Sequence, residues 1–129
     1  MAERYLIDTC AVIKYLALIF PPKGILFIRG IVDEESIISF ISEIELQAWN
    51  PTDPDDMIIY SKFIAGSNII RVDDAVIEMT IEIRKKQKLK IPDAIISATA
   101  IVNGFTLISD NDNDFKKIPG LKYINPASI

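Results

Sequence analysis

Short apolar runs alternate with longer amphipathic stretches along most of this chain. The short runs are rich in isoleucine, leucine and valine, which is typical of strands buried on both faces of a sheet. They predict strands at 4–7, 36–41, 69–72, 106–108 and 122–124. Apolar residues at helical spacing lie between them and predict helices at 10–19, 24–33, 42–49, 55–65, 73–86 and 92–103.

Prolines, glycines and charges mark where several of these helices end. Pro21-Pro22 follows the helix predicted at 10–19, and Gly66 and Asn103-Gly104 follow two others. The basic run 84–86 ends another helix, where the helix dipole favours positive charge. Strands separated by helices pair in parallel through right-handed crossovers. The sequence therefore predicts an α/β fold, a three-layer α/β/α sandwich with a parallel sheet of about five strands.

Length and composition are typical of one globular domain. The chain has 129 residues, of which 50% are hydrophobic and 25% are charged. Splitting this length would leave two poorly buried halves, so we expect a single domain spanning 1–129. The apolar stretch 5–32 is interrupted by charges and prolines, and the first residues lack the basic start of a signal peptide. We therefore expect a cytoplasmic protein without a membrane span.

The residue types that are missing exclude several kinds of catalysis. Histidine is absent, which excludes a Ser-His-Asp triad and most zinc and haem sites. The lone Cys10 can form neither an internal disulfide nor a thiolate zinc site. The net charge is −4 and no basic tail is present, so tight non-specific binding of nucleic acid is not expected. Any catalysis therefore depends on carboxylates, hydroxyls, amides or cations.

Acidic residues recur just after the predicted strands. Asp8 follows the first strand, Glu45 lies in the first turn after the second, and the acidic loop 110–114 follows the fourth. Asp93 opens the helix predicted at 92–103. Ligand sites in open α/β sheets lie beyond the carboxyl ends of the strands, so we expect these side chains to lie close together.

Helix capping offers a second interpretation of each acid. Ser42 and Glu45 fit a capping box with Ser42 as the N-cap, Asp93 is an ordinary first-turn acid, and Asp8-Thr9 is suited to cap the first helix. Serine or threonine would cap equally well, so the recurrence of carboxylates at one edge of the sheet favours a functional site.

Clustered carboxylates stay ionised together only when a cation compensates them. Oxygen ligands suit Mg²⁺ or Mn²⁺, and such ions activate water for phosphodiester hydrolysis without histidine. The acidic loop does not match a calcium-binding EF-hand loop. Counted from Asp110, its sixth and twelfth positions are Phe115 and Leu121 instead of glycine and glutamate. A solvated acidic turn remains the alternative for this loop.

Four segments of the chain, 5–9, 41–46, 89–100 and 107–121, resemble PIN-domain proteins, specifically the VapC-type toxins of toxin–antitoxin pairs. The resemblance extends over essentially the whole chain and implies a Mg²⁺- or Mn²⁺-dependent endoribonuclease. It implies an RNA substrate, hydrolysed to a 3′-hydroxyl and a 5′-phosphate, a VapB-like antitoxin as partner, and a homodimer.

The resemblance also assigns site residues. Asp8, Glu45, Asp93 and Asp114 match the family's acids and would form the catalytic metal site, with Glu43 as a competitor for the role of Glu45. Asp110 and Asp112 are additional acids that could substitute for Asp114, and Ser109 stands where the family usually has threonine. Asn111 fits the family's Asn/Asp position, and Thr9 and Ser42 are placed either to orient the carboxylates or to cap helices.

Contacts with substrate and partners are marked less specifically. The first two predicted helices are strongly apolar, which suits either a filled core or a surface for a partner. Trp49 and Tyr15 could stack on bases, although packing in the core or against a partner is favoured. The cations that could meet RNA phosphates, most of which we expect on solvated helix faces, are Lys14, Arg84, Lys85, Lys86, Lys88, Lys90, Lys116 and Lys117.

Other functions fit the same fold class. A phosphotransfer receiver needs an acidic pair before its phosphorylated aspartate, but Asp8 has no adjacent acid and follows the first strand. A haloacid-dehalogenase-type phosphatase needs an aspartate two residues after the first, where this chain has Cys10. A non-catalytic PIN-like binding module remains the main alternative.

Overall fold

The computed structural model describes residues 2–129, in which strands and helices alternate along the chain. The elements are β1 (Tyr5–Ile7), α1 (Thr9–Leu16), α2 (Pro22–Glu34), β2 (Ile37–Ser39), α3 (Phe40–Ala48), α4 (Asp55–Ala65), β3 (Asn68–Ile70), α5 (Asp74–Lys86), α6 (Ile91–Asn103), β4 (Thr106–Ile108), α7 (Asp112–Phe115), β5 (Lys122–Ile124) and a final 3₁₀ turn (Pro126–Ser128).

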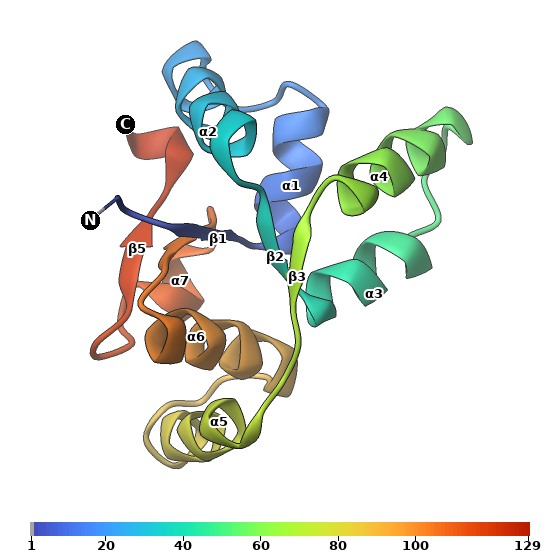
Figure 1. Ribbon diagram of the computed structural model, residues 1–129. Coiled ribbons are helices and arrows are strands. Elements are labelled where there is room, and N and C mark those ends of the chain that lie inside the picture. The colour runs from blue at the N-terminus through green and yellow to red at the C-terminus, as the bar shows by residue number, and fades with distance from the viewer. Residues whose placement is uncertain (1) are drawn as a thin grey trace.

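The five strands of the described residues are parallel and follow the order β3-β2-β1-β4-β5. Figure 1 shows β3 and β5 on opposite sides of β1. In the register, Leu6 of β1 lies opposite Ile37 of β2 and Leu107 of β4. The chain leaves the central strand β1 toward β2 on one side and later reaches β4 on the other. The strand order therefore reverses beside β1, and such a switch point opens a crevice at the carboxyl ends of the strands.

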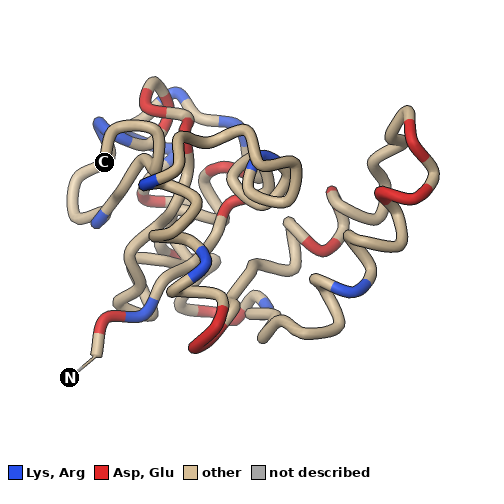
Figure 2. The backbone as a smooth tube through the Cα atoms, turned by 90° about the horizontal axis from the view of Figure 1, so that it is seen from above, with Lys and Arg blue, Asp and Glu red and all other residues tan. Residues whose placement is uncertain are grey.

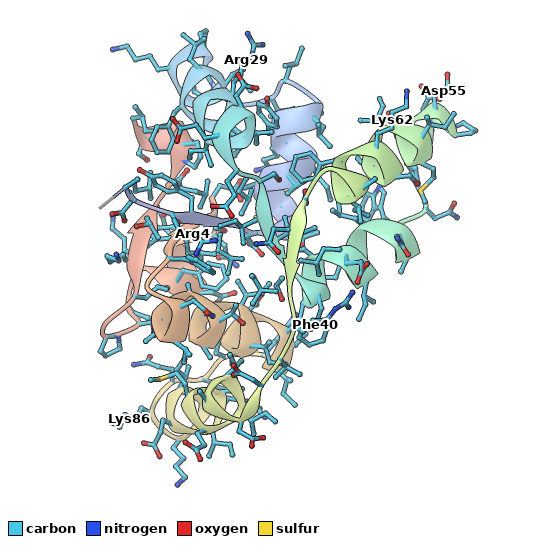
Figure 3. The ribbon with its side chains drawn as sticks, in the orientation of Figure 1. Arg4, Arg29, Phe40, Asp55, Lys62 and Lys86 are labelled. Atoms are coloured by element: carbon cyan, nitrogen blue, oxygen red, sulfur yellow. The ribbon has the colours of Figure 1, made fainter. Side chains whose placement is uncertain are left out.

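Alternate strand residues point into two separate cores, which confirms the predicted three-layer sandwich. Leu6, Ile37 and Leu107 pack with the helices α5 and α6. Their chain neighbours Ile7, Ile38 and Ile108 pack on the opposite face, against α1, α2 and α4. The side chains between the layers are drawn in Figure 3. Both faces of the sheet are thus covered, as its purely apolar strands predict.

Figure 2 shows that basic and acidic residues are interspersed along the described backbone. Within residues 2–129, no helix is both long enough and apolar enough to cross a membrane.

The strands at 106–108 and 122–124 are confirmed in full, whereas the expected boundary after β2 is wrong. The strand ends at Ser39 and α3 begins at Phe40. Ser39 is the N-cap, and its hydroxyl accepts a hydrogen bond from the Ile41 amide at 3.0 Å. Ser42 therefore lies inside the helix, fully buried, and the capping box with Ser42 as its N-cap is incorrect.

Two further local predictions are wrong. The first helix stops at Leu16, because Leu18 adopts a positive φ of 57° that no helix accommodates. Pro21 and Pro22 instead open α2, where a missing amide costs little at the first helical position. The acidic loop also contains a short helix, α7, whose N-cap Asn111 accepts a hydrogen bond from the amide of Asp114 at 3.4 Å.

Substitution of two glycines in α2 can test how closely this helix packs against the C-terminal 3₁₀ turn. A Cβ at Gly24 would overlap the backbone carbonyl of Pro126, whereas a Cβ at Gly30 would meet nothing within 4 Å. We expect Gly24→Ala to lower the free energy of unfolding by about 1–3 kcal/mol through overpacking. Gly30→Ala should raise it by about 0.5–1 kcal/mol through helix propensity. Urea unfolding measures both, and equal effects of the two substitutions would contradict this packing.

Candidate active site

Asp8 lies at the carboxyl end of β1 and is only 6% exposed. It occupies the N-cap position of α1, yet its side chain makes no capping hydrogen bond. Instead, Asp8 Oδ2 accepts a hydrogen bond from Ser109 Oγ at 2.9 Å, which joins the end of β4 to the end of β1. The capping interpretation of Asp8 therefore fails, and its carboxylate lies at the switch point of the sheet.

Cys10 adds a second donor beside Asp8. Its Sγ lies 3.1 Å from Asp8 Oδ2 and 3.0 Å from Asp110 Oδ1. A thiol carries one hydrogen, so it donates to one of these oxygens at a time. Burial raises the pKa of the Cys10 thiol, and the negative charge of Asp8 raises it further. Cys10 is therefore a neutral donor in this site and not a thiolate nucleophile.

Glu45, in α3, points toward the start of α1. Its Oε1 accepts a hydrogen bond from Thr9 Oγ1 at 2.6 Å, and Thr9 Oγ1 also lies 2.8 Å from the Ser42 hydroxyl. Glu43 instead forms an ion pair with Arg71 at 3.2 Å. The structure thus brings Thr9, Ser42 and Glu45 together and separates Glu43 from them.

Asp93 lies half-buried in the first turn of α6, where no side chain caps the helix. Burial raises the pKa of Asp93 to about 6, and the charges of Asp8, Asp114 and Glu45 add to that increase, while Lys90 opposes it. Burial also raises the pKa of Asp8, against the lowering effect of its hydrogen bonds. Asp93 is therefore close enough to each of the other three predicted acids to be repelled by them.

The three aspartates of the acidic loop have different surroundings. Asp110 forms an ion pair with Lys14, and Asp112 Oδ1 accepts a hydrogen bond from the Tyr123 hydroxyl at 2.6 Å. Asp114 Oδ2 accepts a hydrogen bond from Asn111 Nδ2 at 2.7 Å, and of the three aspartates it is the one that raises the pKa of Asp93. Asp114 is thus the loop acid whose charge acts on Asp93.

Within residues 2–129, no three Asp, Glu or Cys side chains lie close enough together to hold a metal ion by themselves. The chemistry of the cluster nevertheless fits a divalent cation. Burial raises the pKa values of Asp8 and Asp93, and the charges of neighbouring carboxylates raise both further, while Lys90 lowers that of Asp93. Carboxylate oxygens suit Mg²⁺, which usually retains several waters and takes few direct protein ligands.

Several contacts were not predicted from the sequence. Lys14 was a candidate for RNA phosphates, but it pairs with Asp110. Tyr123 and the amide of Asn125 hold Asp112, and no local pattern indicates that strand β5 reaches this loop. Trp49 is 51% exposed, so packing in the core is excluded for it, whereas Tyr15 packs beside the core of α1 and α2.

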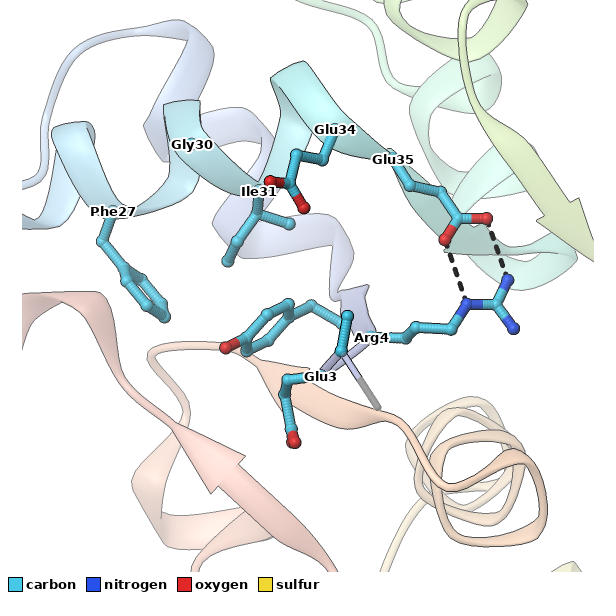
Figure 4. A pocket seen from close by; sticks show the side chains of 9 residues that line it. Glu3, Arg4, Phe27, Gly30, Ile31, Glu34 and Glu35 are labelled. Atoms are coloured by element: carbon cyan, nitrogen blue, oxygen red, sulfur yellow. Dashed lines mark hydrogen bonds and ion pairs between the residues drawn. The ribbon is translucent and has the colours of Figure 1, made fainter.

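A hollow in another part of the described residues lies apart from these acids. It encloses about 690 Å³ and is formed by the start of β1 and the second half of α2, at the amino end of the sheet (Figure 4). Arg4 spans its edge and donates two hydrogen bonds to Glu35, at 3.0 and 2.8 Å. This hollow contains none of the predicted site residues.

Comparison with known proteins gives one family and a set of similar folds. The PIN domain family matches residues 5–121. No curated protein sequence matches the chain. A DNA-bound VapBC structure from Salmonella typhimurium is similar at 20% identity and a TM-score of 0.78, covering 97% of this chain and 99% of that chain.

Two further solved structures are similar over the same extent. A toxin–antitoxin complex from Klebsiella pneumoniae has 26% identity and a TM-score of 0.73, covering 95% of this chain and 97% of that chain. FitAcB from Neisseria gonorrhoeae has 18% identity and a TM-score of 0.74, covering 97% and 99%. The fold is thus shared by proteins whose sequences differ at most positions.

The raised pKa of Asp93 predicts how stability depends on pH in metal-free buffer. An acid whose folded pKa exceeds its unfolded value binds protons more tightly when folded. The free energy of unfolding should therefore fall as pH rises from about 4 through about 6. We expect Asp93→Asn to flatten this fall and to be more stable than wild type at pH 7 by about 1 kcal/mol, a value reduced for partial exposure.

Urea unfolding at several pH values in EDTA measures this effect. Asp74→Asn removes an exposed first-turn acid of α5 and controls for charge at a helix start. An Asp93→Asn profile parallel to that of wild type would show that the carboxylates do not interact.

Proposed function

This chain belongs to the PIN domain family, and we propose that it is a Mg²⁺- or Mn²⁺-dependent endoribonuclease of the VapC toxin type. One observation carries the proposal: burial raises the pKa of Asp93 at the carboxyl edge of the sheet, and the charges of Asp8, Asp114 and Glu45 raise it further. Such concentration of negative charge is unfavourable in a structural role, and it is what a divalent metal site requires.

We assign Asp8 and Asp93 to hold the ion, directly or through water, with Glu45 and Asp114 completing the site. Bound there, a divalent ion supplies positive charge at the scissile phosphate and makes water more acidic, so no histidine is needed.

The residues around the carboxylates keep them in place. Ser109 fixes Asp8, Thr9 fixes one oxygen of Glu45, and Asn111 fixes Asp114. These donors are neutral, so they orient the acids without cancelling their charge. We assign the other oxygen of Glu45 to orient the attacking water. In-line attack on phosphorus then breaks the bond to the 3′ oxygen and leaves a 3′-hydroxyl and a 5′-phosphate.

We further propose that the whole chain, 1–129, is one PIN domain that pairs as a homodimer and is held inactive in the cytoplasm by a VapB-like antitoxin. Exposed apolar side chains where α1 leads into α2 support a protein partner: Leu18 is 69% exposed, Ile19 62% and Leu26 63%. The similar structures described as VapBC and toxin–antitoxin complexes support the same class of partner.

Two glutamates of α3 give a matched test of the proposed activity. We expect Glu45→Gln to reduce cleavage of a structured RNA at least about 100-fold, because it removes a charge and an oxygen that orients water. Glu43→Gln should retain wild-type cleavage, because Glu43 pairs with Arg71 outside the site. Asp8→Asn and Asp93→Asn should be inactive.

The assay uses end-labelled RNA with Mg²⁺, Mn²⁺ or EDTA. Cleavage that survives both aspartate substitutions would place the activity elsewhere. Absence of cleavage by wild type on several classes of RNA would favour the non-catalytic binding module.

Metal binding can be tested without activity. A saturating level of Mg²⁺, about 100 times the dissociation constant, should stabilise the wild-type chain by about 2.7 kcal/mol. Thermal unfolding should show an upward shift that EDTA reverses and that Asp93→Asn largely loses. An equal Mg²⁺ shift in wild type and Asp93→Asn would contradict the assigned site.

A further inference from the structure

We propose that Arg84, Lys88 and Lys90 form a subsite that binds a backbone phosphate of single-stranded RNA next to the carboxylates. This inference rests on the proposed nuclease function and deepens it. The subsite would hold the RNA substrate, whereas the carboxylates would form the site at which the RNA is cut.

The subsite is a cavity between the end of α5 and the start of α6. It encloses about 490 Å³ and is lined by Arg84, Gln87, Lys88, Leu89, Lys90 and Asp114. Asp114 belongs both to this lining and to the carboxylate cluster. An RNA strand that lies across the carboxylates would therefore reach the cavity directly along the surface of the protein.

Arg84 is positioned for anion binding. Its Nε donates a hydrogen bond to the carbonyl oxygen of Leu89 at 3.2 Å, and Leu89 is itself buried, with 6% exposure. This contact anchors the guanidinium to the backbone and leaves its two terminal nitrogens for a ligand. Paired N–H groups of arginine match two oxygens of one phosphate.

Arg84, Lys88 and Lys90 form no ion pair with a carboxylate of the described residues. Ion pairs within residues 2–129 join Arg4, Lys14, Arg71, Lys85 and Lys122 to acids, and none of them includes Arg84, Lys88 or Lys90. Three exposed cations around one cavity repel each other, and this repulsion is relieved when an anion binds between them.

The position of these cations also suits the binding of a negatively charged substrate beside the acids. An RNA strand must approach four acids that repel its phosphates, in a protein of net charge −4. Lys90 already lowers the pKa of Asp93, so its charge is felt at the carboxylates as well as in the cavity. Cations at this point can offset the repulsion for the adjoining phosphate while leaving the acids free for the metal.

Salt-dependent binding of RNA tests the inference. The test compares a triple variant, Arg84→Gln with Lys88→Gln and Lys90→Gln, with a charge-matched control, Lys23→Gln with Arg29→Gln and Lys62→Gln. The control cations are exposed on α2 and α4, and Figure 3 shows Arg29 and Lys62 far from Lys86 at the end of α5. Both sets are made on an Asp8→Asn background so that RNA stays intact.

Fluorescence anisotropy with a labelled single-stranded RNA gives the dissociation constant at several salt concentrations. Each phosphate contact contributes about 0.7 to the slope of log K against log salt, so losing the one phosphate contact of the subsite should lower the slope by about 0.7. At 0.1 M salt this corresponds to about 5-fold weaker binding. The control should retain the parent slope, and single-stranded DNA of the same sequence should show the same loss.

The outcomes separate this inference from the proposed function. If wild type cleaves RNA but the triple variant binds like the control, the subsite is wrong and the nuclease stands. If wild type cleaves no RNA but the triple variant loses slope, the subsite stands and the nuclease fails. Loss with RNA but not with DNA would overturn the phosphate contact. Binding of a polyglutamate peptide without RNA binding would assign the cations to a protein partner.

Discussion

A carboxylate at the end of a buried central strand has lost most of its water, and Asp8 replaces that water with hydrogen bonds from Ser109 and Cys10. These donors come from opposite ends of the chain, and they meet because β1 and β4 are adjacent parallel strands. The crevice exists because the strand order reverses at this point. The placement of Glu45, Asp93 and Asp114 around Asp8 then follows from the helices that begin at the same edge.

Negative charge dominates the electrostatics of the site. Lys14 pairs with Asp110, whereas Lys90 lowers the pKa of Asp93 against the effect of the neighbouring acids. Neutral groups, namely the hydroxyls of Thr9 and Ser109 and the amide of Asn111, hold the acids in position. Mutual repulsion among the acids destabilises the fold, and binding of a cation would recover that free energy. Function and stability are thus opposed at this edge of the sheet.

The periphery of the site has the opposite sign. The acids lie where the strands end, whereas the unpaired cations line the turn that connects α5 to α6. A polyanionic substrate would meet both, with attraction from the cations and repulsion from the acids. For the proposed RNA substrate, this asymmetric arrangement would favour entry from one side. Exposed apolar residues between α1 and α2 lie on the other helical layer, so a protein partner and the substrate would use different surfaces.

The amino-acid sequence by itself determined the parallel α/β sandwich. Short apolar runs, which are long enough for strands but not for helices, alternate along the chain with helical patterns. The sequence also predicted that Asp8, Glu45 and Asp93 lie together, since acids at the carboxyl ends of parallel strands collect at one edge. Only the tertiary structure showed that Asp110, Asp112 and Asp114 have different partners, because contacts with Lys14, Tyr123 and Asn111 depend on how the segments pack together. Likewise, Ser39 caps α3 instead of Ser42, because the length of β2 is set by pairing with β1 and β3. Local sequence carries propensity, whereas contacts between residues about a hundred positions apart arise only when the sheet has formed.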